Sequence, residues 1–181
     1  MLQITIPATE LYDEKLEKFV KVKSVDLQLE HSLVSISKWE AKWHKPFLGS
    51  DAKSAEETLD YVKCMTITPH VDPYAYMALT QANVDEVSKY IQDPMTATWF
   101  RDDKNKRPNR EVITSELIYY WMIALNIPSE YQKWHLNRLL TLIRVCNEKN
   151  QPNKKKMSKA DLAKRNSSLN AARRQANHTS G

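Results

Sequence analysis

The residues best suited to chemistry lie in two places along this chain. His135, Asn137 and Arg138 fall within about one helical turn, and Asp102 and Asp103 are adjacent carboxylates. Acid–base catalysis needs two carboxylates in different environments, whereas neighbours in a charged loop both stay in water. Residues three apart on a helix share a face, so His135 and Arg138 are expected to hydrogen-bond to each other. We therefore predict no catalytic residues and a protein that is not an enzyme.

The residues that usually hold metals and cofactors lack the necessary spacing. The chain has no CxxC or HExxH pattern, and its histidines and its two cysteines, Cys64 and Cys146, are scattered. It has two glycines, Gly49 and Gly181. Phosphate-binding loops need glycines where the backbone approaches the ligand. We predict no metal, no cofactor and reduced cysteines.

The positive charge of the chain is concentrated at its C-terminal end. The whole chain has a net charge of +5, whereas residues 151–181 alone contain eight Lys or Arg and one acid. Such a tail could neutralise nucleic-acid phosphates, dock on an acidic protein surface, or simply stay solvated. Its candidate partner-binding residues are Lys154, Lys155, Lys156, Arg173 and Arg174.

A second candidate contact lies before a charged, apolar-free stretch at 101–110, which is expected to be an exposed loop. Trp99 and Phe100 precede Arg101 there. Aromatic residues and Arg dominate the energetics of protein–protein interfaces. We predict that Trp99, Phe100 and Arg101 contact a partner.

The N-terminal segment has the alternating pattern of strands. Apolar residues alternate with polar ones over 2–6 and again over 25–29, and 19–22 is either a further strand or the lead-in to the second. Two or three strands make a small antiparallel sheet that must lie on helices to be stable.

From Ser32 onward the apolar period becomes helical. Leu33, Ile36, Trp39 and Trp43 predict a helix that ends before Pro46, with Lys38, Glu40 and Lys42 on its wetter side. Later helices are expected to begin after Ser54, which forms a capping box with Glu57, and after Asp72 and Thr80.

The stretch from Thr114 to Asn150 is predicted to be two helices joined at 126–128, the second starting near Ser129 or Glu130. The first is apolar on nearly every side from Leu117 to Leu125, which predicts burial all round at the centre of the fold. It is shorter than the roughly 20 residues needed to cross a bilayer. With no signal peptide or membrane span in the sequence, a cytosolic location is expected.

These patterns predict a mainly α fold with a small N-terminal antiparallel β element, an α+β class, organised around a central buried helical pair at 114–150. Three parts are expected. Residues 1–30 form the β element packed on the helical body, 31–150 form the helical domain, and 151–181 form a basic, flexible tail.

Four segments resemble a group of small proteins encoded by tailed bacteriophages: 36–47 (ISKWEAKWHKPF), 113–122 (ITSELIYYWM), 134–146 (WHLNRLLTLIRVC) and 165–174 (RNSSLNAARR). The resemblance covers most of the chain. The group belongs to the tail-morphogenesis region of siphoviruses, where such proteins are called tail assembly chaperones. It has no catalytic residues to carry over.

The resemblance implies a non-enzymatic morphogenesis protein in the host cytoplasm during assembly. Such chaperones coat the tape measure protein, bring tail tube subunits to it, and are often made in two lengths by a programmed frameshift. Two alternatives stay open: a minor structural protein of the head or tail, located in the virion, and a nucleic-acid-binding accessory protein that uses the basic tail. Self-association is also left open, and no membrane partner is expected.

Overall fold

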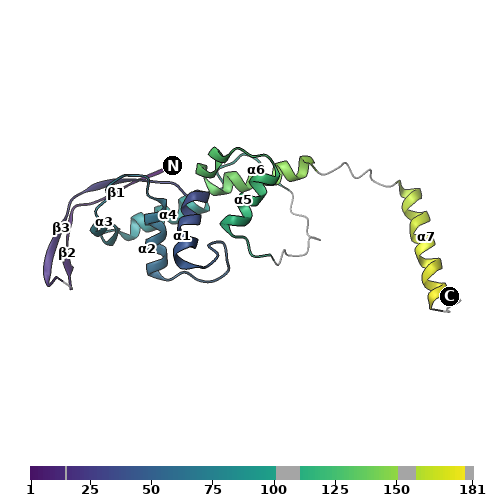
Figure 1. Ribbon diagram of the computed structural model, residues 1–181, viewed down its shortest axis with the longest axis horizontal. Helices are drawn as coiled ribbons and strands as arrows, with labels where there is room; N and C mark the ends of the chain where they lie inside the picture. The colour runs from purple at the N-terminus through teal and green to yellow at the C-terminus, as the bar shows by residue number, and fades with distance from the viewer. Residues whose placement is uncertain (15, 101–110, 151–157, 178–181) are drawn as a thin grey trace. The chain divides into compact units, whose positions relative to one another are not determined.

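The computed structural model describes residues 1–14, 16–100, 111–150 and 158–177 (Figure 1). The chain divides into two compact units, Met1–Asn147 and Glu148–Gly181. Within the described residues, seven α-helices and four strands give the predicted α+β class, with the strands at the N-terminus. The predicted charged loop at 101–110 and the tail residues 151–157 lie outside the described residues.

The elements follow one another in a simple order. The strands are β1 (Leu2–Ile6), β2 (Thr9–Asp13), β3 (Lys18–Val22) and β4 (Val25–Leu29). The helices are α1 (Leu33–Trp43), α2 (Ala55–Met65), α3 (Pro73–Met77), α4 (Gln81–Gln92), α5 (Ser115–Ala124), the 3₁₀ helix η1 (Ser129–Lys133), α6 (Leu136–Asn150) and α7 (Lys159–Ala176). No helix in the described ranges is both long and apolar enough to span a bilayer.

The four strands form two antiparallel pairs in one shared register. Ile6 pairs with Val25 at the end of β1 and β4, and Thr9 pairs with Val22 at the start of β2 and β3. The interruption falls at Pro7, which has no N–H to donate to a ladder. The result is a hairpin whose outer half, β2 and β3, lies next to α3 (Figure 1).

The hairpin is anchored by its inner half. Ile4, Ile6, Leu27 and Leu29 are buried at the period of two that strands require. On the other edge of β4, Ile67 N–H donates to Gln28 O at 2.8 Å and Glu30 N–H donates to Met65 O at 2.9 Å. The segment after α2 therefore holds β4 against the helices.

The centre of the fold is α1. Its Leu33, Ile36 and Trp39 are fully buried, and the helix packs against α2, α5 and η1. The predicted capping box is present, with Ser54 accepting from Glu57 N–H, and the predicted cap Thr80 forms a similar box with Asn83 at the start of α4. These caps satisfy backbone N–H groups that a helix start leaves free.

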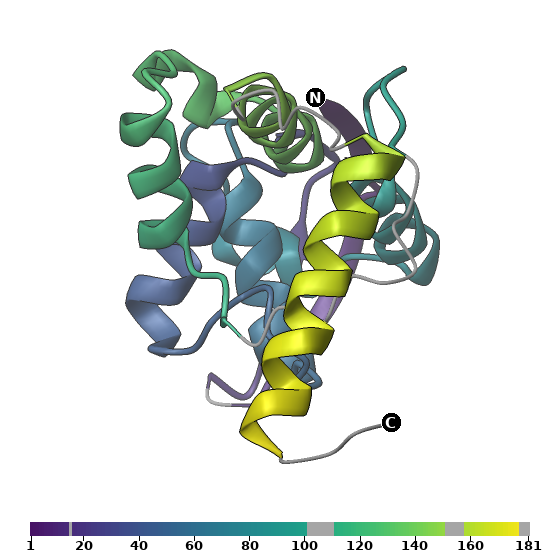
Figure 2. The same ribbon diagram turned by 90° about the vertical axis from the view of Figure 1, so that its right-hand side faces the viewer.

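The predicted burial of the first central helix is wrong for one side of α5. Ile118 and Met122 are buried, but Tyr120 is 63% exposed and Ile123 is 76% exposed. Figure 2 shows α5 at the outer edge of the unit, with α1 between it and α2. The centre of the fold therefore lies at α1, much earlier in the chain than the predicted centre at α5.

The second central helix also begins later than predicted, at Leu136 instead of Ser129 or Glu130. Residues 129–133 form the short helix η1, and the backbone then becomes extended. Leu136 N–H donates to His31 O at 2.7 Å, and His135 forms a β-bridge with Ser32. This pairing with the start of α1 interrupts the helix.

Candidate partner-binding surfaces

Three acidic residues of α1 and α2 are buried, which makes them candidates for a catalytic site. Asp60 accepts from Lys42 and, at 3.0 Å, from Trp43 Nε1, while Glu57 accepts from Lys45 Nζ at 2.5 Å. The Lys45 hydrogen bond lowers the pKa of Glu57. Burial alone would raise the pKa of Asp60, but the bonds from Lys42 and Trp43 lower it overall. Both carboxylates therefore stay ionised, and their hydrogen bonds help to hold the two helices together.

The third buried carboxylate, Glu40, links α5 to α1. One oxygen accepts from Phe47 N–H at 2.7 Å, and the other accepts from Ser115 N–H, in the first turn of α5, at 2.8 Å. A carboxylate at a helix N-terminus is favoured by the helix dipole and satisfies a free N–H. The expectation that Glu40 lies on the wet side of its helix is therefore wrong, because its carboxylate accepts hydrogen bonds in the interior of the fold.

Two buried histidines meet where α1 begins. The rings of His31 and His135 are 5.0 Å apart, and His31 Nδ1 lies 2.5 Å from the hydroxyl of Tyr61. His135 Nδ1 accepts from Asn137 N–H, so its Nε2–H donates to Tyr90 O at 3.0 Å. Burial lowers the pKa of His31 to about 3, and burial also lowers the pKa of His135. Both rings are neutral and closed to solvent.

The predicted hydrogen bond between His135 and Arg138 is not the arrangement found. The Arg138 guanidinium stacks 4.1 Å from the Trp134 ring, and His135 turns into the core. Among the described residues, no group of three or more His, Cys, Asp or Glu is placed to hold a metal ion.

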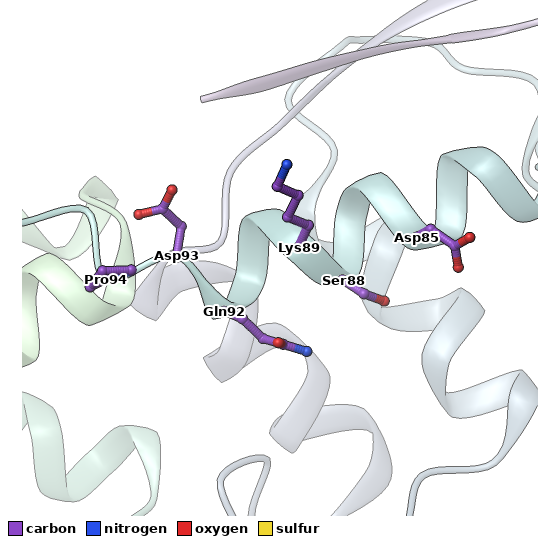
Figure 3. A pocket seen from close by; sticks show the side chains of 6 residues that line it. All are labelled: Asp85, Ser88, Lys89, Gln92, Asp93 and Pro94. Carbon is purple, nitrogen blue, oxygen red and sulfur yellow. The ribbon is translucent and has the colours of Figure 1, made fainter.

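A depression on α4 is lined mostly by polar residues. It measures about 480 Å³ and is lined by Asp85, Ser88, Lys89, Gln92, Asp93 and Pro94. Figure 3 shows that these side chains do not converge: the ends of Lys89 and Gln92 point away from each other. A substrate site needs polar groups aimed at one point, so this hollow is not a candidate.

The first partner-binding candidate is the α5 outer face, formed by Tyr120 and Ile123. The two residues are three apart and project from the same side of the helix, away from α1. Exposed apolar side chains that gather on one face mark interaction sites more often than isolated ones do. The sequence did not predict this surface, because the apolar pattern of the helix predicted that both residues are buried.

The second candidate is the hairpin groove, a hollow of about 720 Å³ between the hairpin end and α3. Its lining residues are Leu11, Tyr12, Asp13, Glu14, Pro73, Tyr74 and Met77. Tyr74 hydroxyl donates to Asp13 at 2.5 Å and fixes one side of the groove. Tyr12 and Met77 are exposed along it, and the Phe19 ring packs 5.2 Å from that of Tyr12. No pattern in the sequence predicted that these residues form a groove.

The predicted contact at Trp99 and Phe100 divides into two different environments. Trp99 is 76% exposed. Phe100 is half-buried, and the Arg144 guanidinium lies 3.9 Å from its ring. Phe100 thus anchors the segment on α6 and leaves Trp99 available to a partner. Arg101, the third predicted member, lies outside the described residues.

The predicted basic contacts are also divided. Lys154, Lys155 and Lys156 lie outside the described residues, whereas Arg173 and Arg174 are exposed on α7. That helix belongs to the second unit, Glu148–Gly181.

Comparisons of the chain with models of protein families, with curated proteins and with solved structures gave no match. The surfaces themselves therefore carry the functional argument. They belong to a helical unit whose buried carboxylates and imidazoles are hydrogen-bonded within the fold and whose exposed apolar side chains include Tyr120, Ile123 and Trp99.

Proposed function

We propose that this protein is a non-enzymatic assembly factor that acts by binding other proteins, and that its role is that of a phage tail assembly chaperone. The observation that carries the proposal is the α5 outer face. Tyr120 and Ile123 are exposed on a helix that is fixed from its inner side by Ile118, Met122 and the Glu40 carboxylate. A preformed apolar surface on a rigid support binds with little ordering penalty.

The energetic scale fits a binding role. Fully burying one large apolar side chain contributes roughly 1.5–3 kcal/mol. Tyr120 and Ile123 contribute little of this to the fold, because they stay in water. A partner that covers both would gain most of it, which is the behaviour of an interface anchor.

The number of surfaces suits a protein with two partners. The α5 outer face, the hairpin groove and Trp99 belong to different elements of the unit Met1–Asn147. A tail assembly chaperone must hold the tape measure protein and also receive tail tube subunits. The four segments that resemble such chaperones include residues 113–122, which contain Tyr120. We place the protein in the host cytoplasm during assembly.

The test is co-expression of the intact chain with the tape measure protein of the same phage. We expect the two to co-purify, and we expect mass spectrometry of finished virions to lack this chain. Stoichiometric amounts in purified virions would instead make it a structural protein of the head or tail.

A matched pair of variants assigns the surface. Tyr120→Ala with Ile123→Ala should abolish co-purification. Asp85→Ala with Gln92→Ala, two exposed residues on α4, should leave it intact. Equal recovery with both double variants would remove the α5 outer face from the proposal.

A further inference from the structure

Helix α7 has no apolar support of its own. Each of its side chains that the structure describes is exposed, including Leu169. A helix of 18 residues without an apolar stripe gains nothing from packing and is marginal in water. Its role must therefore come from what its polar surface binds.

One face of α7 carries a distinctive set of side chains. Successive residues of an α-helix turn by about 100°, so positions spaced three and four apart fall on one side. On this spacing lie Ala163, Asn166, Ser167, Asn170, Arg173, Arg174 and Asn177, which we call the Asn/Arg face. It contains two small residues, three Asn, two Arg and no acid.

Those residue types match the edges of DNA bases. Arg donates two hydrogen bonds to guanine, Asn pairs its amide with adenine, and small side chains let a helix come close to the groove floor. The B-DNA major groove admits an α-helix, and α7 is about 27 Å long at 1.5 Å per residue. Lys164 and Arg165 lie on the opposite side of the helix from this face, so they contribute to binding through phosphates and not through base edges.

Other anionic partners fit less well. A protein interface needs a central apolar or aromatic anchor, and the Asn/Arg face has none. Single-stranded nucleic acid is held by aromatic stacking, and residues 151–181 contain no Phe, Trp or Tyr. The major groove of an RNA duplex is too deep and narrow for side chains to recognise bases. Charge and shape together favour duplex DNA.

We propose that α7 binds duplex DNA with its Asn/Arg face in the major groove. The groove supplies the environment that the helix lacks, so binding stabilises the helical conformation. This activity is separate from the proposed chaperone role, which uses surfaces of the unit Met1–Asn147. Loss of either activity is measured without reference to the other.

The experiment titrates the full chain against a fluorescent 20-base-pair DNA duplex at several salt concentrations. With five Lys or Arg in 159–176, we expect log affinity to fall with log salt at a slope of about −3 to −4. Arg173→Ala with Arg174→Ala should weaken binding at least tenfold at physiological salt, an expectation of about 1.4 kcal/mol.

The control removes the same charge from outside the face. Lys164→Ala with Arg165→Ala should weaken binding less than about threefold, because it removes phosphate contacts only. Both pairs introduce two alanines into the helix, so a difference in helix propensity does not separate them. Asn166→Ala with Asn170→Ala keeps the charge and should reduce the preference among DNA sequences.

Three outcomes would overturn the proposal. One is the absence of salt-dependent binding by the intact chain. Another is an equal loss in the two cationic double variants, which would mean charge alone binds. The third is equally tight binding to an RNA duplex, to single-stranded DNA or to polyglutamate.

Discussion

Helices α1 and α5 are neighbours that invert the usual rule of polar outside and apolar inside. Helix α1 looks amphipathic, yet it buries the Glu40 carboxylate, and its partner α2 buries Glu57 and Asp60. Helix α5 looks apolar all round, yet it exposes Tyr120 and Ile123. The polar groups of the first region are paired, whereas no residue that the structure describes covers the apolar groups of the second.

The contrast separates residues that build the fold from residues available for binding. Buried charges persist only where partners satisfy them, as Ser115 N–H and Phe47 N–H do for Glu40. Exposed apolar groups need no such arrangement and contribute little to stability. Changes in the first region should therefore alter stability, and changes in the second should alter binding.

The largest expected loss of stability is at Trp39. It is fully buried, and its Nε1–H donates to Glu57 O at 2.9 Å. Trp39→Ala should lower the free energy of unfolding by about 3–5 kcal/mol, measured by urea denaturation. Trp99→Ala removes the same side chain from an exposed position and should change it by less than about 0.5 kcal/mol. Similar losses of stability for Trp39→Ala and Trp99→Ala would contradict the contrast between buried and exposed positions.

The next effect depends on pH. The unfolded chain protonates His31 near its ordinary pKa of 6.5, whereas the folded chain keeps it neutral down to about 3. The unfolded state binds more protons in this range, so stability is complete above pH 6.5 and falls as pH drops below it. The expected slope is up to about 1.4 kcal/mol per pH unit.

Urea denaturation between pH 6.5 and 4.5 measures this slope before most carboxylates titrate. His31→Gln should reduce this slope to the part that the buried His135 contributes. His70→Gln, at an exposed position, should leave the slope unchanged. A wild-type stability that is constant over these two pH units would show that His31 is not held neutral by burial.

Glu40 should have an intermediate effect. Glu40→Gln keeps the size of the side chain but replaces one acceptor oxygen with an NH₂ group that faces a backbone N–H. An unsatisfied buried N–H costs about 1–3 kcal/mol. The free energy of unfolding should fall by that amount, and hydrogen exchange should accelerate at whichever of the Ser115 and Phe47 amides faces the NH₂ group. Glu86→Gln, on the exposed side of α4, serves as the control and should change neither quantity.

The smallest effect is expected at the hairpin groove. The Tyr12 and Phe19 rings meet edge to face in water, and such pairs contribute about 0.5–1.5 kcal/mol at most. Tyr12→Ala should lower the free energy of unfolding by no more than about 1 kcal/mol while reducing capture of a partner that uses the groove. A loss as large as that for Trp39→Ala would place the groove in the core.

Local signals in the sequence predicted much of the fold. Alternation located β1 and β4, and side-chain caps located the starts of α2, α3 and α4. These features are determined by residues close together in the sequence, so a local pattern is enough to predict them. Strand β2 was missed because Leu11 is flanked by Glu10 and Tyr12 in an exposed hairpin, where no clear apolar alternation is required.

The errors have a common physical origin in contacts between distant segments. Glu40 is buried because Ser115, far along the chain, needs an acceptor. The start of α6 is delayed because the backbone at Leu136 pairs with His31. Neither cause is visible within a local window of sequence.

The candidate site was predicted less well than the fold. Trp99, which is exposed, was a candidate from the sequence because an aromatic residue beside a charged stretch is conspicuous there. Tyr120 and Ile123 were not, because an apolar helix has no mark that separates its inner side from its outer side. Only the position of α5 at the edge of the unit distinguishes them.

The most direct test measures binding and stability on one variant. Tyr120→Ala with Ile123→Ala is titrated calorimetrically against the tape measure protein, and its urea denaturation is compared with that of the wild-type chain. We predict at least tenfold weaker binding with a free energy of unfolding unchanged within about 0.5 kcal/mol. Unchanged affinity, or a stability loss above about 2 kcal/mol, would contradict the account.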